Sequence, residues 1–448
     1  MKIKKIVAMT SLTALAALPG VTLATNGMNM EGYGPVATAM GGASMAYDNG
    51  TAAVMNNPAT LGLMSQGSRV DLAVGMLGPD VTAKMGGMPD AASGGDAYYM
   101  PALGWAKKNG ALAYGVAVFS QGGMGTEYGA NSFLAMGSNE DVRSELGVGR
   151  VIFPMAYELN KDFTIGGSVD FVWAGLDLKM ALPAAAMAPA AMGGMRTAET
   201  GALGGAINGG ALNTATYARI DFSDGSDYTG EAAGTGFAAK LGFTWKATPT
   251  LIVGGVYQSK TELDDLETGA GGARLSADVG PGFADRGKIT VHDFQWPEIF
   301  AIGVAFQASP QLLIVGDVKQ IGWASVMDKF RMTYSSEQMG GSVSFAMDQN
   351  WDDQTVFSLG AQYAVNSELK LRAGANISDN PIPAATLNAL FPAIVEDHYM
   401  VGVGYAFGKA STVDFALTYA PEVSIAAASG VTSMHSQTNW QLMYSYRY

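Results

Sequence analysis

Few side chains in this sequence are of the kinds that catalyse reactions or bind metals. The 448 residues contain no cysteine and three histidines, His292, His398 and His435. Their spacing matches neither a metal site nor a Ser–His–Asp triad, although strands distant in sequence can meet. The acidic run 262–267, "ELDDLE", offers oxygen ligands for a divalent cation, but such runs are more often solvated turns. We therefore predict no catalytic residue, no metal site and no cofactor.

The charge balance argues against nucleic acid as a partner. Residues 1–24 have a basic start, a short apolar core at 6–18 and a small residue, Ala24, at the expected cleavage point, which predicts a signal peptide. Without its three lysines the chain keeps 23 of its 26 basic residues against 39 acidic ones, a net charge of −16. Phosphate binding needs basic patches, which this composition does not provide.

The strongest pattern is a two-residue alternation of bulky apolar residues with polar or small ones, which is typical of strands with two different faces. It recurs in residues 67–78, 161–180, 367–378 and 396–408. At the C-terminus the apolar parity is almost entirely aromatic, with Trp440, Leu442, Tyr444, Tyr446 and Tyr448. A chain rich in glycine and poor in charge, with such strands, suits a barrel whose outer face contacts lipid.

The connections between these strands alternate in length. Six short turns are expected near 108–110, 159–162, 246–250, 307–311, 365–368 and 408–411. Seven long stretches rich in Gly, Asp and Ser are expected near 79–97, 123–142, 181–234, 264–286, 329–350, 379–396 and 423–435. This pattern predicts an all-β membrane protein in which residues 67–448 form a 14-stranded antiparallel transmembrane β-barrel. Both ends of the barrel are then expected on the side of the short turns, which is the periplasmic side. The alternative is a soluble all-β protein or a secreted adhesin.

Residues 25–66 do not alternate and are rich in Ala, Met and Gly. A barrel of this size is too wide for wall side chains alone to fill, as they do in barrels of about eight strands. We therefore expect this segment to form an N-terminal hatch, or plug, inside the lumen.

Four stretches together resemble one family. They are "GGASMAYDNGTAAVMNNPATL" at 41–61 and the segments 296–323, 351–383 and 397–419. In this order they are similar to the FadL-type outer-membrane transporters, which take up long-chain fatty acids or, in other branches, aromatic hydrocarbons. The resemblance implies a non-enzymatic, passive transporter in the outer membrane of a Gram-negative bacterium. Substrate would be captured at an extracellular loop, pass the hatch and leave sideways at a kink in the third strand.

The resemblance also suggests site residues. Gly122, Gly123 and Gly125, before "TEY" at 126–128, lie where the lateral-gate kink is expected; the alternative is an ordinary loop start. Met187, Met192 and Met195 on the long loop 181–234 suggest a capture patch, or equally a loop that packs on itself.

Candidate cations for a fatty-acid head group are Lys179, Lys329 and Arg331, although solvated or lipopolysaccharide-facing side chains are the commoner interpretation. Without such a cation, a neutral hydrocarbon becomes the expected substrate.

The hatch motif is Asn57, Pro58 and Ala59, with Asn57 as the cap and Pro58 as the first residue of a short helix. This bend either moves when substrate arrives or caps a fixed plug.

Two other functions fit the class of a membrane barrel. A general porin would have an open, charged lumen without a plug, and a barrel lipase would need one of the histidines beside a serine. For the leading hypothesis the expected partners are a hydrophobic small molecule, outer-membrane lipid and lipopolysaccharide, and the barrel-assembly machinery through the strand ending at Tyr448. The chain is expected to be a monomer.

Overall fold

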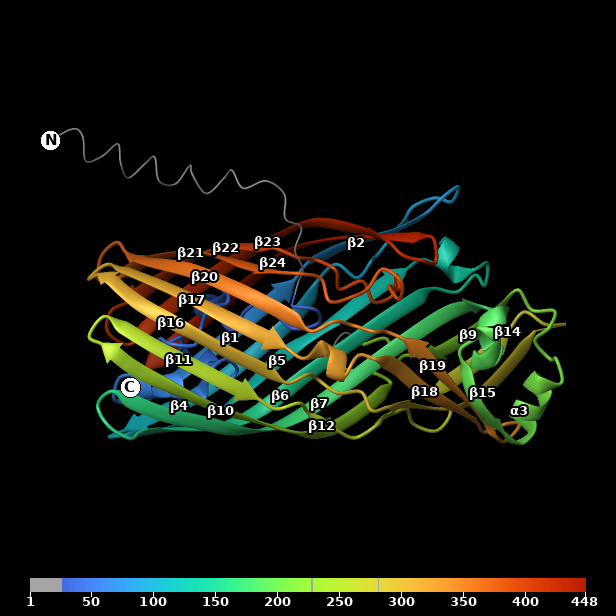
Figure 1. The fold of residues 1–448 in the computed structure, drawn as a ribbon, viewed down its shortest axis with the longest axis horizontal. Coiled ribbons are helices and arrows are strands. Elements are labelled where there is room, and N and C mark those ends of the chain that lie inside the picture. Colours follow the sequence, from blue (N-terminus) through green and yellow to red (C-terminus); the bar gives the residue numbers. More distant parts are fainter. Residues whose placement is uncertain (1–25, 227–228, 281) are drawn as a thin grey trace.

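The computed structural model describes residues 26–226, 229–280 and 282–448, so the predicted signal peptide lies outside the described residues. An antiparallel sheet closes into an elongated barrel (Figure 1). The wall strands, in order of pairing, are β1 (Gly67–Leu77), β4 (Tyr98–Asn109), β5 (Leu112–Tyr128), β6 (Val142–Glu158), β7 (Phe163–Pro183), β10 (Ala232–Thr248), β11 (Leu251–Gln258), β16 (Ile299–Ser309), β17 (Leu312–Ile321), β20 (Gln354–Ala364), β21 (Leu369–Ser378), β22 (His398–Phe407), β23 (Ser411–Ala426) and β24 (Val431–Arg447). Strand β24 pairs with β1 from Arg69–Arg447 to Met76–Trp440 and closes the wall.

The prediction of 14 strands is wrong, because within the described residues the sheet has 24 strands. Most of the additional strands lie in the segments that the sequence assigned to long loops, although residues 262–263 and 287–292 fall outside them. They are β2 (Pro79–Met85), β3 (Ala91–Ala92), β8 (Arg196–Thr200), β9 (Tyr217–Phe222), β12 (Glu262–Leu263), β13 (Leu266–Glu267), β14 (Ala273–Ala277), β15 (Phe283–His292), β18 (Lys329–Ser336) and β19 (Ser342–Asp348). Several of them, such as β18 ("KFRMTYSS") and β19 ("SVSFAMD"), do alternate apolar with polar residues, but they are short and lie within stretches rich in Gly, Asp and Ser that hid the pattern. Pairing with neighbouring strands, such as β9 with β7, keeps them extended. The six short turns are confirmed.

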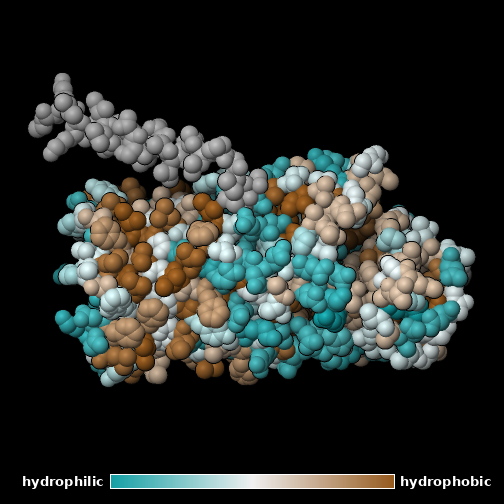
Figure 2. All heavy atoms as spheres, in the orientation of Figure 1, coloured by the Kyte–Doolittle hydropathy of each residue, from teal (hydrophilic) through white to brown (hydrophobic). Residues whose placement is uncertain are grey.

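The outer surface divides into two zones. Near the short turns and the C-terminus it is largely apolar, and toward α3 (Gly201–Asn208) and β15 it becomes more hydrophilic (Figures 1 and 2). The apolar zone consists of outward-facing side chains such as Phe153 and Met155 of β6, Phe300 and Ile302 of β16, and Val401 of β22, all of which are exposed. Apolar side chains facing outward are stable only in lipid, so this zone is the membrane-spanning part of the wall.

The other helices are short. They are α2 (Pro35–Thr38), η1 (Gly50–Val54), η2 (Pro58–Leu63), η3 (Phe133–Ala135), η4 (Ala184–Met187), η5 (Ala190–Met192) and η6 (Trp323–Ser325). Among the described residues, no helix has the length and the apolar character needed to cross a membrane.

Residues 26–66 lie in the lumen and contact the wall on several sides. Helix α2 contacts β22, β23 and β24, whereas η2 contacts β6, β7 and β10. The wall meets this segment with inward-facing glycines: a Cβ at Gly360 or Gly374 would collide with the backbone of Met40 and Gly41, and a Cβ at Gly254 with the carbonyl oxygen of Met45. At Met40, Gly41 and Met45 the segment is therefore packed with its backbone against the backbone of the wall.

These contacts predict the effect of a larger side chain. Gly374→Val should displace residues 40–41, because the colliding atoms belong to the backbone and cannot rotate away. We expect a folded barrel with a larger single-channel current than wild type in planar bilayers. Gly316→Val on β17 is the matched control, since a Cβ there would meet only ordinary contacts beyond 3.4 Å. An unchanged current in Gly374→Val would show that the segment does not seal the lumen at this point.

Candidate functional site: an opening in the wall

The ladder of backbone hydrogen bonds breaks between β4 and β5. Strand β5 pairs with β4 only from Leu112–Asn109 to Val118–Leu103. Beyond that pair, β4 continues along β1 as far as Tyr98, and β5 continues along β6 as far as Tyr128. The two strands therefore separate, and the wall has a gap at the end of β5 that lies farther from the short turns.

A β-bulge produces this separation. The pairing of β5 with β6 shifts between Ser120 and Gly122, so that Gln121 is the extra residue. A bulge of this kind bends its strand and reverses which residues face outward. Gly122 has a φ of 156°, and a Cβ there would collide with the carbonyl oxygen of Met28.

The predicted kink glycines all lie within this bent part of the strand. Gly122, Gly123 and Gly125 belong to β5, which continues through them to Tyr128, so they do not mark the start of a loop. A Cβ at Gly123 would collide with the carbonyl oxygen of Leu146 on β6. Glycine is thus required where β5 lies close to other backbone.

Residues 26–33 cover the inner side of the gap. The N–H of Gly123 donates to the carbonyl of Met28 at 3.1 Å, and Asn29 forms an isolated bridge with Gly122. The hydroxyl of Tyr33 lies 2.8 Å from Asn29 Oδ1 and 2.6 Å from the carbonyl oxygen of Gln121. Backbone groups that β5 does not share with β4 are in this way partly satisfied by the lumenal segment.

The bulge is also attached to a buried cluster of charges. Arg150 Nε donates to Gln121 Oε1, and Arg150 Nη1 lies 2.9 Å from Asp170 Oδ2. Lys240 also binds Asp170, and the side chains of Arg150, Asp170 and Lys240 have no exposed area. A charge that is buried away from water is stable only when it is paired, so the two cations and the carboxylate hold one another in place. The cluster thereby fixes the position of Gln121, which Arg150 contacts.

A cavity of about 690 Å³ passes through the gap. Its lining includes Tyr99 and Val118, which are exposed on the outer face, together with inward-facing residues such as Gly122 and His435. Most of the rest of the lining is apolar or glycine, including Met100, Phe119, Met124, Leu146, Val148 and Trp173. The cavity therefore joins the lumen to the outside of the wall.

The charged groups of this cavity are acidic. Glu145, Asp264, Asp265 and Glu267 line it, and among the described lining residues there is neither lysine nor arginine. An anionic ligand would enter an acidic environment here, whereas a neutral one would not be repelled.

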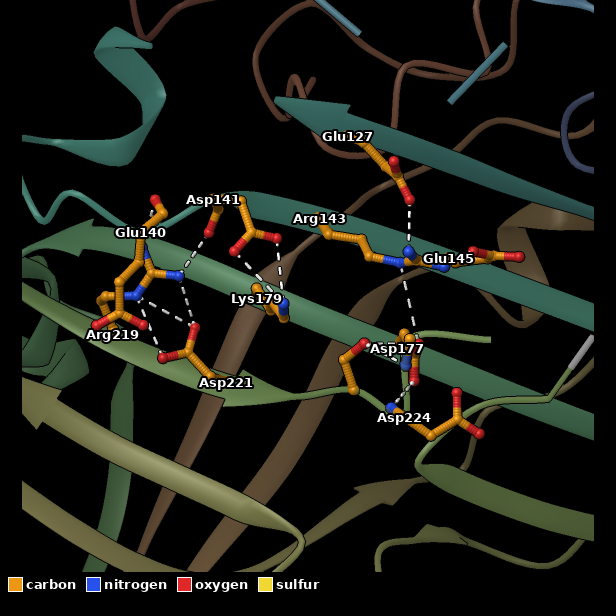
Figure 3. A network of polar contacts seen from close by, with 12 residues as sticks. Glu127, Glu140, Asp141, Arg143, Glu145, Asp177, Lys179, Arg219, Asp221 and Asp224 are labelled. Atoms are coloured by element: carbon orange, nitrogen blue, oxygen red, sulfur yellow. Dashed lines mark hydrogen bonds and ion pairs between the residues drawn. The ribbon is translucent and has the colours of Figure 1, made fainter. Parts of the chain in front are cut away.

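The three candidate cations lie elsewhere. Lys179 binds Asp141 at 3.1 Å in a polar network beyond the apolar zone, with Arg143 and Arg219 nearby (Figure 3). Lys329 binds Asp348, and Arg331 lies 3.5 Å from Asp328. None of the three lines the cavity, and each has a carboxylate neighbour.

The methionines of the long loop differ in their environments. Met187, at the end of η4, is 2 % exposed, and its carbonyl oxygen accepts from Arg196 Nε at 3.0 Å. Met192 is 80 % exposed and Met195 is half-buried. These side chains do not line the cavity, so the structure does not bring them to the gap.

The hatch motif has the predicted local geometry. Asn57 caps η2, its side chain accepting from the N–H of Ala59 at 3.1 Å, and Pro58 is the first helical residue. Asn57 Nδ2 donates to the carbonyls of Met45 and Phe243. One buried amide thus ties η2 both to the lumenal segment and to β10.

His398 and His435 are both buried and lie near each other, whereas His292 contacts other residues. His292 Nδ1 lies 2.8 Å from Asp265 and its Nε2 lies 2.8 Å from Thr333, an order of groups that resembles a hydrolase triad. The hydroxyl of Thr333 also lies 2.9 Å from that of Ser344, in the pairing of β18 with β19. Burial raises the pKa of Asp265, but hydrogen bonds from the Asp293 N–H and from His292 outweigh it and lower this pKa. Within the described ranges, no three or more His, Cys, Asp or Glu side chains lie together in a way that could hold a metal ion.

Comparison with known proteins decides the family. Residues 9–444 match the family described as "Outer membrane protein transport protein (OMPP1/FadL/TodX)". The chain belongs to this family. Among solved structures, the Pseudomonas putida toluene transporter TodX is 30 % identical, with a TM-score of 0.82 and coverage of 93 % of this chain and 99 % of TodX. The Ralstonia pickettii toluene transporter TbuX is 32 % identical, with a TM-score of 0.78 and the same coverage.

A curated relative adds little. An uncharacterized protein from Chlorobium limicola is 51 % identical over 83 residues, which is 18 % of this chain and 41 % of that protein. Membership of the OMPP1/FadL/TodX family places the protein in the outer membrane of a Gram-negative bacterium. The family and its structural neighbours are transport channels rather than enzymes.

Sequence reasoning missed several residues of the site. Arg150, Asp170 and Lys240 are charged residues at positions of their strands that alternate with the lipid-facing ones, so they face inward. This alternation is the pattern from which they could have been found. Gln121 and His435 carried no signal, because a bulge position and a cavity wall depend on strands that are distant in sequence.

The charge cluster makes a prediction about stability. Asp170→Asn should destabilise the barrel by about 3–5 kcal/mol, since it leaves Arg150 and Lys240 buried without a carboxylate. The free energy of unfolding in guanidinium chloride, followed by tryptophan fluorescence, measures this. Asp141→Asn is the matched control: it removes an exposed partner of Lys179 and should change the free energy of unfolding by less than about 1 kcal/mol. Equal losses in the two variants would contradict a special role for the buried cluster.

Proposed function

We propose that this protein is a passive channel for small, uncharged hydrophobic molecules, such as monocyclic aromatic hydrocarbons. The observation that carries the proposal is the cavity through the gap, which is lined mainly by apolar groups and glycine and has no lysine or arginine among its described lining residues. Its volume of about 690 Å³ lies in the range of roughly 300–1,000 Å³ usual for small-molecule sites. Lipopolysaccharide excludes apolar solutes, so a protein path with an apolar lining is useful to them.

The acidic lining supports a neutral substrate over a fatty acid. A carboxylate in the cavity would lie among Glu145, Asp264, Asp265 and Glu267, and the cations nearest to these residues, Arg143 and Lys288, are already paired with Glu145 and Glu267. Long-chain fatty acids therefore remain the second candidate. The relatives TodX and TbuX, described as toluene transporters, support the same choice.

The proposed route ends in the bilayer. Substrate enters from the extracellular end, with the loop carrying Met187, Met192 and Met195 as the proposed capture surface, and reaches the cavity. It then leaves between β4 and β5, where Gly122, Gly123 and Gly125 form the proposed lateral gate. The lumenal segment 26–66, which belongs to the predicted hatch 25–66 and carries Asn57, Pro58 and Ala59, acts as the proposed hatch that prevents an open aqueous pore. The backbone packing of residues beyond Met40 against the wall supports a path that does not run straight through the lumen.

The remaining partners are proposals as well. They are outer-membrane lipid and lipopolysaccharide around the wall, the barrel-assembly machinery at the strand ending at Tyr448, and a monomeric state. The exposed aromatic residues Tyr444, Tyr446 and Tyr448 near the chain end support a membrane-facing last strand.

Transport of labelled toluene and of labelled oleate tests the substrate class. The full chain is expressed in the outer membrane of a host that lacks its own transporters of this family, and uptake is measured at low substrate concentration. We expect faster uptake of toluene than in the empty host, and no gain for oleate. A gain for oleate alone would replace the neutral substrate with a fatty acid, and a large steady single-channel current would favour a general porin.

Gly122→Val tests the gate. The added side chain would collide with Met28 at the inner edge of the gap, so we expect at least a tenfold loss of toluene uptake with a barrel that still folds. Gly316→Val, on a lipid-facing position of β17, should leave uptake unchanged. Normal uptake through a folded Gly122→Val variant would rule out the gap as the route.

A further inference from the structure

His435 lies on β24, and none of the ion pairs among the described residues involves it. It faces inward from a position paired with Val81 of β2 and Val423 of β23. Its side chain is 5 % exposed and lines the cavity. A polar side chain at such a position needs a hydrogen-bond partner for each of its polar atoms.

One ring nitrogen has a partner and the other does not. His435 Nδ1 lies 2.7 Å from the carbonyl oxygen of Pro392. A carbonyl oxygen can only accept, so Nδ1 carries the hydrogen. A neutral imidazole has a single N–H, which makes Nε2 a bare acceptor. Nε2 is buried and has no partner in the described part of the chain.

The hydrogen bond to Pro392 explains why a histidine is suitable on the Nδ1 side, but it gives no partner to Nε2. A buried acceptor left without a donor is unfavourable, and a ligand that brings a donor can recover the loss. Four carboxylates also line the cavity and can accept from a hydroxyl: Glu145, Asp264, Asp265 and Glu267. Three of them already accept hydrogen bonds, Glu145 from Arg143, Asp265 from His292, and Glu267 from Lys288, so the variants of His435 below distinguish its nitrogen from them.

We propose that His435 Nε2 is the hydrogen-bond acceptor of a polar subsite in this cavity, and that the site takes uncharged aromatic molecules bearing a hydroxyl group, of the phenol class. The hydroxyl donates to Nε2, and the ring occupies the apolar lining formed by residues such as Phe119 and Val148. A carboxylate has no hydrogen to donate at neutral pH and is excluded by the same nitrogen. This inference rests on the proposed function and names the substrate class of the same cavity.

A pair of isosteric ligands tests the subsite. The full chain in lipid nanodiscs is titrated calorimetrically with 4-methylphenol and with 1,4-dimethylbenzene, which differ by a hydroxyl in place of a methyl group; empty nanodiscs give the correction for partitioning into lipid. His435→Phe keeps a ring and removes the acceptor. We expect it to weaken binding of the phenol about tenfold and to leave binding of the hydrocarbon within about twofold. His435→Gln, whose amide oxygen can accept, should restore part of the loss.

Two controls keep the result interpretable. Val148→Ala removes apolar contact from the same cavity and should weaken both ligands to the same degree. In the wild-type protein labelled with ¹⁵N-histidine, the phenol but not the hydrocarbon should shift one Nε2 signal, which requires no variant to fold.

The outcomes separate the two proposals. If both ligands bind and His435→Phe changes them in parallel, or if no Nε2 signal shifts, the subsite is overturned while the channel for neutral molecules stands. If neither ligand binds the wild-type protein, both proposals fail.

Discussion

Inside a bilayer every backbone N–H and C=O must find its partner within the protein, and the gap between β4 and β5 is where this sheet departs from that requirement. The missing strand-to-strand hydrogen bonds are partly replaced by hydrogen bonds to the lumenal segment. Met28 and Asn29 pair with the bent part of β5, and Tyr33 reaches the carbonyl of the bulge residue Gln121. The lumenal segment is thus part of the wall as well as its filling.

Two kinds of packing divide that segment. From Met40 onward it lies against inward-facing wall glycines, with backbone in contact with backbone, and Asn57 fixes η2 by three hydrogen bonds. Residues 26–33 are attached to the wall by hydrogen bonds instead: Met28, Asn29 and Tyr33 contact the bent part of β5, and Gly32 accepts from Gln441 of β24. The Arg150–Asp170–Lys240 cluster holds the other side of the bulge. The structure therefore combines a lumenal segment that is closely packed against the wall with an opening in the wall beside that segment.

Period-two alternation predicted the membrane-spanning parts of the wall, because lipid outside and polar groups inside alternate strictly along each strand. The short turns were predicted from the connections between these strands, and the cap at Asn57 from the residue types Asn and Pro. The prediction failed for the sheet beyond the membrane, where β9, β14, β15, β18 and β19 are short strands inside stretches rich in Gly, Asp and Ser, and pair with one another and with β7. The glycines of the kink could be found from their composition and from resemblance. His435 and the acidic lining could not, since a cavity brings together strands that are hundreds of residues apart, and the cations chosen from the sequence proved to have local carboxylate partners.

Bridging the gap with a covalent link tests the central claim most directly, and the absence of cysteine from the chain makes the experiment clean. Pro101 and Ser120 both line the cavity, and they flank the gap just beyond the last pair, Leu103 and Val118. In Pro101→Cys/Ser120→Cys, a short reagent that joins two thiols should abolish uptake of labelled toluene, and reduction should restore it. The same reagent on Ile314→Cys/Ala361→Cys, a pair on the closed seam between β17 and β20, should have no effect. Undiminished uptake across the bridged gap would contradict the lateral route.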